Sequence, residues 1–197
     1  MIAAIVLSAG ESSRMGSPKA LLGIDGKTFI EAIVSSLRET RVGKILVVLG
    51  HNAEQLRPKV EPLGVTVVVN PDYKKGQLSS LIAAVRSLET GTAGVEAILI
   101  HLVDHPCINP SVVNEMIDRF YASKKLIIIP TYKGKRGHPV LLSSRLFPEL
   151  LSAPVAQGAK VVVRGHPEDT LELATEDEGV IIDVDTPEEY RKHLGRK

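Results

Sequence analysis

One stretch near the amino terminus decides the fold: residues 5–19 read IVLSAGESSRMGSPK. An apolar run typical of a buried strand passes directly into a loop of glycine and serine that carries two cations, Arg14 and Lys19. Backbone N–H groups in such a loop point at anionic oxygens, arginine offers a two-pronged donor and lysine supplies a point charge. The stretch predicts a phosphate-binding site, and the alternative is an ordinary strand-to-helix turn with solvated cations.

The spacing within this loop argues against two better-known phosphate sites. A P-loop has four residues between its glycines and then a lysine followed directly by serine or threonine, whereas five residues separate Gly10 from Gly16 and Lys19 stands behind Ser17-Pro18. A dinucleotide-binding loop has three glycines and opens a helix, but position 12 is serine here and a proline interrupts the helix. The chain is therefore expected to be neither a P-loop ATPase nor a nicotinamide-dependent dehydrogenase.

Composition limits the partners and the organisation of the chain. The 197 residues are 44% hydrophobic, which is enough for one full core, so a single domain over residues 1–197 is expected. Its 24 basic and 23 acidic residues are interspersed and leave a net charge of +1, so neither nucleic acid nor a membrane is an expected partner. One cysteine, Cys107, allows no internal disulfide, and the first residues do not resemble a signal peptide, so the cytoplasm is the expected location.

Short β-branched runs alternate with longer amphipathic ones along the chain. The expected strands are Ile2–Leu7, Lys44–Leu49, Val65–Val69, Ala97–Val103, Leu126–Pro130, Val140–Leu142, Thr170–Ala174 and Val180–Asp183. The expected helices are Phe29–Arg38, Ala53–Val60, Leu78–Leu88, Pro110–Phe120, Ser144–Leu151, Ala156–Arg164 and a last one from Thr186, capped by Asp185 or Thr186. Strands that are almost wholly apolar are typical of a parallel sheet covered on both faces. The pattern predicts an α/β fold, a Rossmann-like three-layer sandwich with a mostly parallel central sheet, whose ligands bind beyond the carboxyl ends of the strands.

Two aspartate motifs follow strands of this predicted sheet. Asp104 lies just before Pro106 at the end of the fourth strand, where its carboxylate could ligate Mg²⁺, and the alternative is an aspartate that starts a turn. Asp183 and Asp185 are two residues apart and could present a paired carboxylate, but Asp185 also begins a sequence typical of a helix N-terminus. Which of these two would bind metal is left open.

Two further motifs combine polar groups with turns. Residues 70–80 (NPDYKKGQLSS) follow the third strand and offer amide, hydroxyl and backbone groups that could recognise a base, or serines that simply cap a helix. Residues 134–139 (GKRGHP) could meet a second phosphorylated substrate or form a solvated hairpin tip; we favour a role for His138 in contacting that substrate. His51, His166 and His193 are expected at the surface or at helix ends.

Taken together, these motifs resemble the MobA-like nucleotidyltransferases, and within them the branch around molybdenum cofactor cytidylyltransferase. The resemblance covers essentially the whole chain and is carried, in order, by LSAGESSRMG at residues 7–16 with KALL at 19–22, NP at 70–71, GQLSSL at 76–81, DHP at 104–106, GHPV at 137–140 and DVDTPE at 183–188. It implies the fold of nucleotide-diphospho-sugar transferases and transfer of NMP from an NTP to a phosphorylated acceptor, with release of pyrophosphate and with Mg²⁺ as cofactor.

The same resemblance implies roles for individual residues. Arg14 and Lys19 resemble the groups that bind the triphosphate and, with Asp104, are the implied catalytic residues. Asp104 and Asp185 resemble the pair that binds Mg²⁺. The implied nucleotide-binding residues are Leu7, Ala9, Gly10, Arg14, Lys19, Asn70, Gly76, Gln77 and Ser80, of which Gly76 and Ser80 resemble contacts to the base.

The base and the acceptor follow from finer features of the resemblance. Guanylyl-transferring relatives usually have Gly-Gly where this chain has Ala9-Gly10, so CTP is the expected nucleotide. The cytidylyl branch implies a molybdopterin-type acceptor and delivery of the product to a molybdoenzyme or its chaperone. His105 and Ser8 depart from that branch, where Gln and Ala are more usual. The alternatives are a guanylyltransferase, a sugar-phosphate nucleotidyltransferase and a non-catalytic nucleotide-binding module.

The expected chemistry requires no general base. A phosphate monoester has its second pKa near about 6, so the acceptor is already a dianionic nucleophile at neutral pH. The protein must instead bring two polyanions together and hold the attacking oxygen in line with the leaving pyrophosphate. Cations perform this task, which is why Arg14, Lys19 and the predicted Mg²⁺ site dominate the interpretation.

Overall fold

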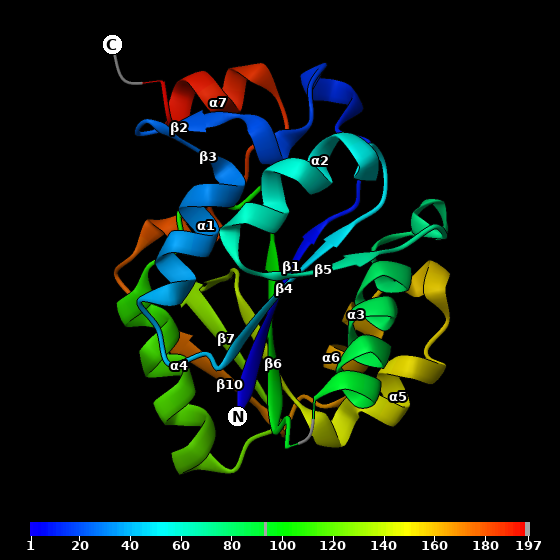
Figure 1. Cartoon of the computed structure of the whole chain (residues 1–197). Coiled ribbons are helices and arrows are strands. Elements are labelled where there is room, and N and C mark those ends of the chain that lie inside the picture. The colour runs from blue at the N-terminus through cyan, green and yellow to red at the C-terminus, as the bar shows by residue number, and fades with distance from the viewer. Residues whose placement is uncertain (93, 196–197) are drawn as a thin grey trace.

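A computed structural model describes residues 1–92 and 94–195 of the chain, and Figure 1 shows a twisted central sheet with helices on both faces. The sheet has eight strands in the order β10-β7-β9-β6-β1-β4-β5, with β8 paired to β7. Its strands are β1 (Ile2–Ser8), β4 (Lys44–Leu49), β5 (Thr66–Val69), β6 (Ala97–Leu102), β7 (Ile127–Tyr132), β8 (Lys135–Arg136), β9 (Val140–Ser143) and β10 (Thr170–Ala174). A separate two-stranded hairpin consists of β2 (Gly23–Ile24) and β3 (Lys27–Thr28).

The sheet is mostly parallel, as expected. β1 pairs in parallel with β4 and β6, β4 with β5, and β7 with β10. β9 runs antiparallel between β6 and β7, and β8 is antiparallel to β7. Every residue of β1 is buried, because helices cover both faces of the sheet at its centre. The predicted α/β sandwich is therefore confirmed.

The described residues form seven α-helices: α1 (Phe29–Arg38), α2 (Ala53–Val60), α3 (Gln77–Gly91), α4 (Pro110–Ser123), α5 (Phe147–Ser152), α6 (Lys160–Gly165) and α7 (Pro187–His193). Short 3-10 turns join several of them. One face of the sheet packs against α1, α2 and α4, and the other against α3, α5 and α6 (Figure 1). Alternate residues of β1 serve the two cores: Ala4 and Val6 on the first face, Ile5 and Leu7 on the second. No helix within the described residues is both long enough and apolar enough to span a bilayer.

Parallel pairing places several loops at one edge of the sheet. The chain leaves β1 after Ser8, β4 after Leu49, β5 after Val69 and β6 after Leu102, and all four strands end at that edge. Loops that meet beyond the carboxyl ends of neighbouring parallel strands form the usual ligand crevice of such a sheet. The four loops therefore delimit the place where the predicted site residues can meet.

Local structure differs from the expectation at the carboxyl-terminal part of the chain. The predicted strand Val180–Asp183 was wrong: residues Glu178–Ile181 form a 3-10 turn, followed by an extended segment outside the sheet. Val180 and Val184 are buried although they join no strand, so their apolar, β-branched character reflects packing rather than sheet pairing. The expected helix Ala156–Arg164 is interrupted at Gly158, whose φ of 70° has left-handed geometry, so a short turn precedes α6.

Candidate active site

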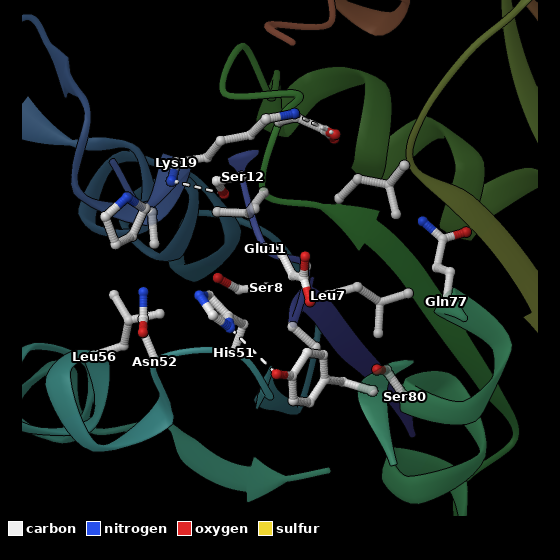
Figure 2. A pocket seen from close by; sticks show the side chains of 18 of the residues that line it. Leu7, Ser8, Glu11, Ser12, Lys19, His51, Asn52, Leu56, Gln77 and Ser80 are labelled. Carbon is white, nitrogen blue, oxygen red and sulfur yellow. Dashed lines mark hydrogen bonds and ion pairs between the residues drawn. The ribbon is translucent and has the colours of Figure 1, made fainter. Parts of the chain in front are cut away.

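A first cavity of about 690 Å³ lies beyond the carboxyl edge of the sheet. It is lined by most of the residues predicted to bind nucleotide or metal, namely Leu7, Ala9, Gly10, Arg14, Lys19, Gly76, Gln77, Ser80, Asp104 and Asp185. In Figure 2, Lys19 and Ser12 lie on one side of this cavity, and Gln77 and Ser80 lie on the opposite side. Loops after β1, β5 and β6 and the segment before α7 thus converge on one space.

Lys19 is the electrostatic centre of the first cavity. Its side chain is only 10% exposed, and its Nζ lies 3.1 Å from Asp104 Oδ2 and also contacts Asp185 Oδ1. Arg14 is 65% exposed and places Nη2 2.6 Å from Asp185 Oδ2. The Lys19 hydrogen bond and charge, with a further contribution from Arg14, hold the pKa of Asp185 below its ordinary value. Two cations and two carboxylates therefore balance one another inside the cavity.

The loop between β1 and the first cavity wall is built by local hydrogen bonds. Ser12 has a left-handed backbone, with φ of 51°, and its carbonyl accepts a bond from the Met15 N–H at 3.0 Å. The Ser12 hydroxyl accepts a bond from the Lys19 N–H at 3.2 Å, which closes the loop (Figure 2). A Cβ added to Gly10 would meet no atom within 4 Å, so the loop backbone there borders open space. Gly10 and Glu11 are exposed and line the cavity, so the loop backbone borders the space where a phosphate-binding loop would meet its ligand.

Asp185 owes its position to the start of α7. Thr186 and Glu189 form a capping box: the Thr186 hydroxyl accepts a bond from the Glu189 N–H, and the Glu189 carboxylate accepts one from the Thr186 N–H. The same carboxylate accepts a bond from the Asp185 N–H at 2.9 Å. Thr186 is therefore the cap, and the Asp185 side chain is left available to the first cavity. A helix start at Thr186 and a metal-binding role for Asp185 are therefore compatible, because the cap and the charged site use different atoms.

The two carboxylates of the first cavity fit a hard divalent cation. Asp104 Oδ1 is buried, and within the described residues it has no hydrogen-bond partner. Mg²⁺ takes few protein oxygens and completes its coordination with phosphate and water, so two carboxylates suffice, although the described part of the chain holds no group of three or more candidate metal ligands. Asp183 is exposed and does not line the cavity, so the structure favours Asp185 as the partner of Asp104.

The far wall of the first cavity combines α3 with the turn before it. Gly76 has φ of 112°, a conformation that favours glycine, and Gln77 and Ser80 follow on the first turn of α3. Asn70, predicted to bind nucleotide, is buried and is not among the lining residues. Its amide donates to the hydroxyls of Ser79 at 2.9 Å and Ser80 at 3.0 Å. Asn70 therefore positions the helix start and does not face the cavity.

Sequence reasoning missed His51 and Asn52, which together with Tyr73 of the 70–80 motif form a third wall. His51 Nδ1 lies 3.2 Å from the Tyr73 hydroxyl, and the His51 N–H donates to the Ala9 carbonyl at 3.0 Å. A Cβ on Gly50 would lie 2.5 Å from the Tyr73 Cβ, so only glycine permits this close packing. His51 thus lies at a helix end, just before the N-cap of α2, as one of the two expected placements had it, and it is half-buried in the wall of the first cavity. Its place directly after the second strand of the sheet was the signal that could have found it.

A second cavity of about 310 Å³ adjoins the first and contains the predicted acceptor residue His138. The two cavities share Leu7, Gln77 and Leu102 in their walls. The His138 N–H donates to the Val180 carbonyl at 2.8 Å, and a Cβ on the preceding Gly137 would lie 2.2 Å from that oxygen. Close approach of the Glu178–Ile181 turn therefore requires glycine at position 137 and fixes His138 beside the first cavity.

Histidines near the carboxylate pair are uncharged at neutral pH. The rings of His105 and His138 lie 4.7 Å apart, and His101 Nε2 contacts the His105 carbonyl at 2.7 Å. Burial lowers the pKa of His138 to about 4 and that of His101 to about 3, and it lowers the pKa of His105 as well. His138 can therefore offer a hydrogen bond to a ligand, but it does not offer the positive charge that a phosphate-binding cation would supply.

Comparisons with known proteins agree with this geometry. A model of the MobA-like NTP transferase domain matches residues 4–171. Nicotine blue oxidoreductase of Paenarthrobacter nicotinovorans is 29% identical over 98% of this chain and 96% of its own length. Molybdenum cofactor cytidylyltransferase of Escherichia coli is 26% identical, over 94% of this chain and 92% of its own length.

Solved structures share the fold of this chain, and one of them contains a divalent metal. Rv0371c from Mycobacterium tuberculosis superimposes with a TM-score of 0.83 at 30% identity, covering 99% of this chain and 97% of its own. Its complex with manganese gives a TM-score of 0.78 at 28% identity, covering 100% of this chain and 99% of its own. A similar protein thus holds a divalent metal. With the family match over most of its length and the charged cavity beside its first loop, this chain belongs to the family of MobA-like NTP transferase domains and is a nucleotidyltransferase.

Proposed function

We propose that this protein transfers CMP from CTP to the phosphate of a small-molecule acceptor of the molybdopterin type and releases pyrophosphate. The observation that carries the proposal is the first cavity, in which buried Lys19 bridges two carboxylates beside a loop of exposed backbone groups. That combination of cations, carboxylates and an exposed glycine- and serine-rich loop suits a triphosphate accompanied by a divalent metal. One relative is named an oxidoreductase, but the paired charges favour phosphoryl chemistry in this chain.

The reaction needs one bond to form and one to break. An oxygen of the acceptor phosphate attacks the α-phosphorus of the nucleotide, and the bond from that phosphorus to the oxygen bridging the β-phosphorus breaks, so pyrophosphate leaves with that electron pair. No proton has to be removed, since the acceptor phosphate is a dianion at neutral pH. The residues of the site therefore act by binding and orienting rather than as acids or bases.

The four charged side chains that pair with one another in the first cavity each have a part in this transfer. Lys19, buried between the carboxylates, and Arg14, at the exposed side, are the groups that neutralise charge on the β- and γ-phosphates as pyrophosphate departs. Asp104 and Asp185 would hold Mg²⁺, which when bound supplies positive charge at the α-phosphate. Asp104 and Asp185, now paired with Lys19 and Arg14, would be the residues that hold the metal, and Lys19 and Arg14 would then be available to the phosphates.

The base and the acceptor occupy opposite ends of this arrangement. Gly76, Gln77 and Ser80 present backbone and neutral polar groups, which suit the N4 donor and the N3 and O2 acceptors of cytosine. His138 lies in the adjoining second cavity and, being neutral, would donate or accept a hydrogen bond from the acceptor. The wall that the two cavities share at Leu7 and Leu102 supports a position of the acceptor next to the α-phosphate.

The experiment that tests the proposal is a nucleotide panel with Mg²⁺, read first by thermal stabilisation and then by pyrophosphate release with a molybdopterin-type acceptor. We expect CTP to stabilise the protein and to give the highest kcat/KM. A preference for GTP would overturn the cytidylyl assignment and keep the transferase. Pyrophosphate release from no nucleotide with any phosphorylated acceptor would overturn the transfer itself.

A further inference from the structure

We propose that the acceptor has an apolar body and a second anionic group besides the reacting phosphate, and that Lys160 and Arg164 bind this second group at the mouth of the second cavity. This inference deepens the proposed function and rests on it, because it assigns the second cavity to the acceptor. The class of acceptor is thus a phosphate monoester built on an apolar or aromatic framework with a distal anion. A polyhydroxylated sugar phosphate does not match it.

The walls of the second cavity determine the nature of the acceptor body. They combine aliphatic side chains from α3, from three strands and from α6, namely Leu78, Leu81, Ile100, Ile129, Val140, Leu142 and Val163. A hydroxyl moved from water against such walls without a partner costs about 1–3 kcal/mol. Several sugar hydroxyls would each lose their water there, whereas an apolar ring gains from burial. The interior therefore selects against sugars and for apolar frameworks.

The rim of the second cavity carries cations that differ in how they are paired. Arg136 is held by Glu172, with the carboxylate 2.7 Å from Nη2 and 2.8 Å from Nε. Lys160 and Arg164 also line the cavity and are exposed, but no carboxylate lies within ion-pair distance of either among residues 1–92 and 94–195. They stand four residues apart on α6, the spacing that places two side chains on one helix face. Like charges at that spacing repel each other, and an anion between them removes the repulsion.

Neighbouring acidic groups do not neutralise this pair. Glu149, on the adjacent α5, contacts His166 Nε2 at 2.6 Å, and Asp169 lies 3.7 Å from the other ring nitrogen of His166. That arrangement raises the pKa of His166 through its hydrogen bond to Glu149. Glu149 and Asp169 are thus both engaged with His166, whereas Lys160 and Arg164 are exposed and line the second cavity.

Continuity between the cavities sets the direction of the acceptor. Leu7, Gln77 and Leu102 form the common wall, so a phosphate at that junction borders the nucleotide site. The rest of the acceptor then extends beneath α3 and α6, and its far end reaches the mouth where Lys160 and Arg164 lie. One molecule can make all of these contacts if it has a phosphate at the junction of the two cavities, an apolar middle against the aliphatic walls and a second anion beside Lys160 and Arg164.

The test uses the intact protein and a fluorescent probe of this chemistry, 1-anilinonaphthalene-8-sulfonate, beside the uncharged N-phenyl-1-naphthylamine. The double variant Lys160→Ala/Arg164→Ala should weaken binding of the sulfonate by about tenfold or more, the scale of a lost charge-assisted hydrogen bond, and leave binding of the neutral probe within about twofold. Lys160→Arg/Arg164→Lys should restore the sulfonate affinity. Lys59→Ala/Arg86→Ala removes the same charge from exposed positions of α2 and α3 and should change neither probe.

Two further measurements locate the site and separate it from the proposed function. Val163→Trp, at a half-buried position of α6, should block both probes by filling the cavity, and glucose 1-phosphate should displace neither probe. Unchanged sulfonate affinity in Lys160→Ala/Arg164→Ala, or displacement by glucose 1-phosphate, would overturn this inference. The probe assay contains no nucleotide, so its outcome is independent of turnover. If the probes contradict the inference but CTP is still turned over, the proposed transferase activity stands and only the assignment of Lys160 and Arg164 falls. If the probes behave as expected but no NTP is turned over, the anion site in the second cavity stands and the proposed transferase activity falls.

Discussion

The two adjoining cavities balance their charges in opposite ways. In the first cavity Lys19 and Arg14 are already paired with Asp104 and Asp185, so the positive and negative groups neutralise each other before any ligand arrives. In the second cavity Lys160 and Arg164 border aliphatic walls without carboxylate partners in the described part of the chain. The first arrangement suits two ligands of opposite charge that enter together, a metal and a triphosphate. The second suits an anion that arrives alone.

The largest effect should come from the carboxylate with the buried, unpartnered oxygen. Asp104→Asn keeps the size of the side chain but removes the charge that would hold Mg²⁺, so we expect turnover to fall by about 10²–10³ or more, the usual cost of losing one electrostatic group at the reacting centre. Nucleotide affinity should change much less. Pyrophosphate release and calorimetric CTP binding measure the two quantities. Full turnover in this variant, or in EDTA, would contradict the proposed role of the metal pair.

Removal of the bridging cation should affect binding more than folding. Lys19→Ala leaves Asp104 and Asp185 facing each other without their common partner and deprives the triphosphate of its most buried cation. We expect CTP affinity to fall by about 10–100-fold, because a charge-assisted hydrogen bond contributes about 1.5–3 kcal/mol. Lys19→Arg serves as the control that retains charge. An unchanged dissociation constant in Lys19→Ala would remove the phosphate-loop interpretation.

Arg14 allows a milder test of the same cavity. Its guanidinium is mostly exposed, so its ion pair with Asp185 should contribute less than about 1 kcal/mol to stability. Arg14→Ala should therefore leave the urea midpoint almost unchanged and weaken CTP binding by up to about tenfold. Raising the salt concentration should reduce the difference in CTP affinity between Arg14→Ala and wild type, since exposed charges are screened. A gap that does not change with salt would show that Arg14 acts through packing.

The smallest effect concerns acid stability. Because Lys19 and Arg14 lower the pKa of Asp185 in the folded protein, its ionised form contributes stability above the pKa of the unfolded chain, and this contribution is lost as pH falls through the lower, folded value. Asp185→Asn has no such titration. Wild type should therefore lose slightly more stability than Asp185→Asn between about pH 5 and pH 2 in urea unfolding. Parallel pH profiles for the two proteins would show that the pairing does not contribute to folding.

Prediction from the sequence succeeded where a feature depends on residues that are close together in the chain. The apolar run predicted as the strand Ile2–Leu7 forms a strand, Ile2–Ser8, that is covered on both faces. The phosphate site predicted in the loop that follows stays a prediction, although its residues line the first cavity. The capping sequence at Thr186 likewise specified the start of α7. Prediction failed at Val180–Asp183, where the buried Val180 packs beside Gly137 without entering the sheet. The local run of apolar residues indicates that this segment is buried, but it does not indicate whether the segment pairs with a strand of the sheet.

The sequence by itself thus determined the alternation of strands and helices, the loop chemistry around Arg14 and Lys19, and the family to which they point. Only the tertiary structure decided which charges meet, because Lys19 is separated from Asp104 by 85 residues and from Asp185 by 166. It also decided that Asn70 supports a helix start while His51 lines the first cavity, and that the exposed Lys160 and Arg164 line a largely apolar cavity. The physical reason is that contacts between distant segments follow from how strands order themselves in the sheet, and no local periodicity encodes that order.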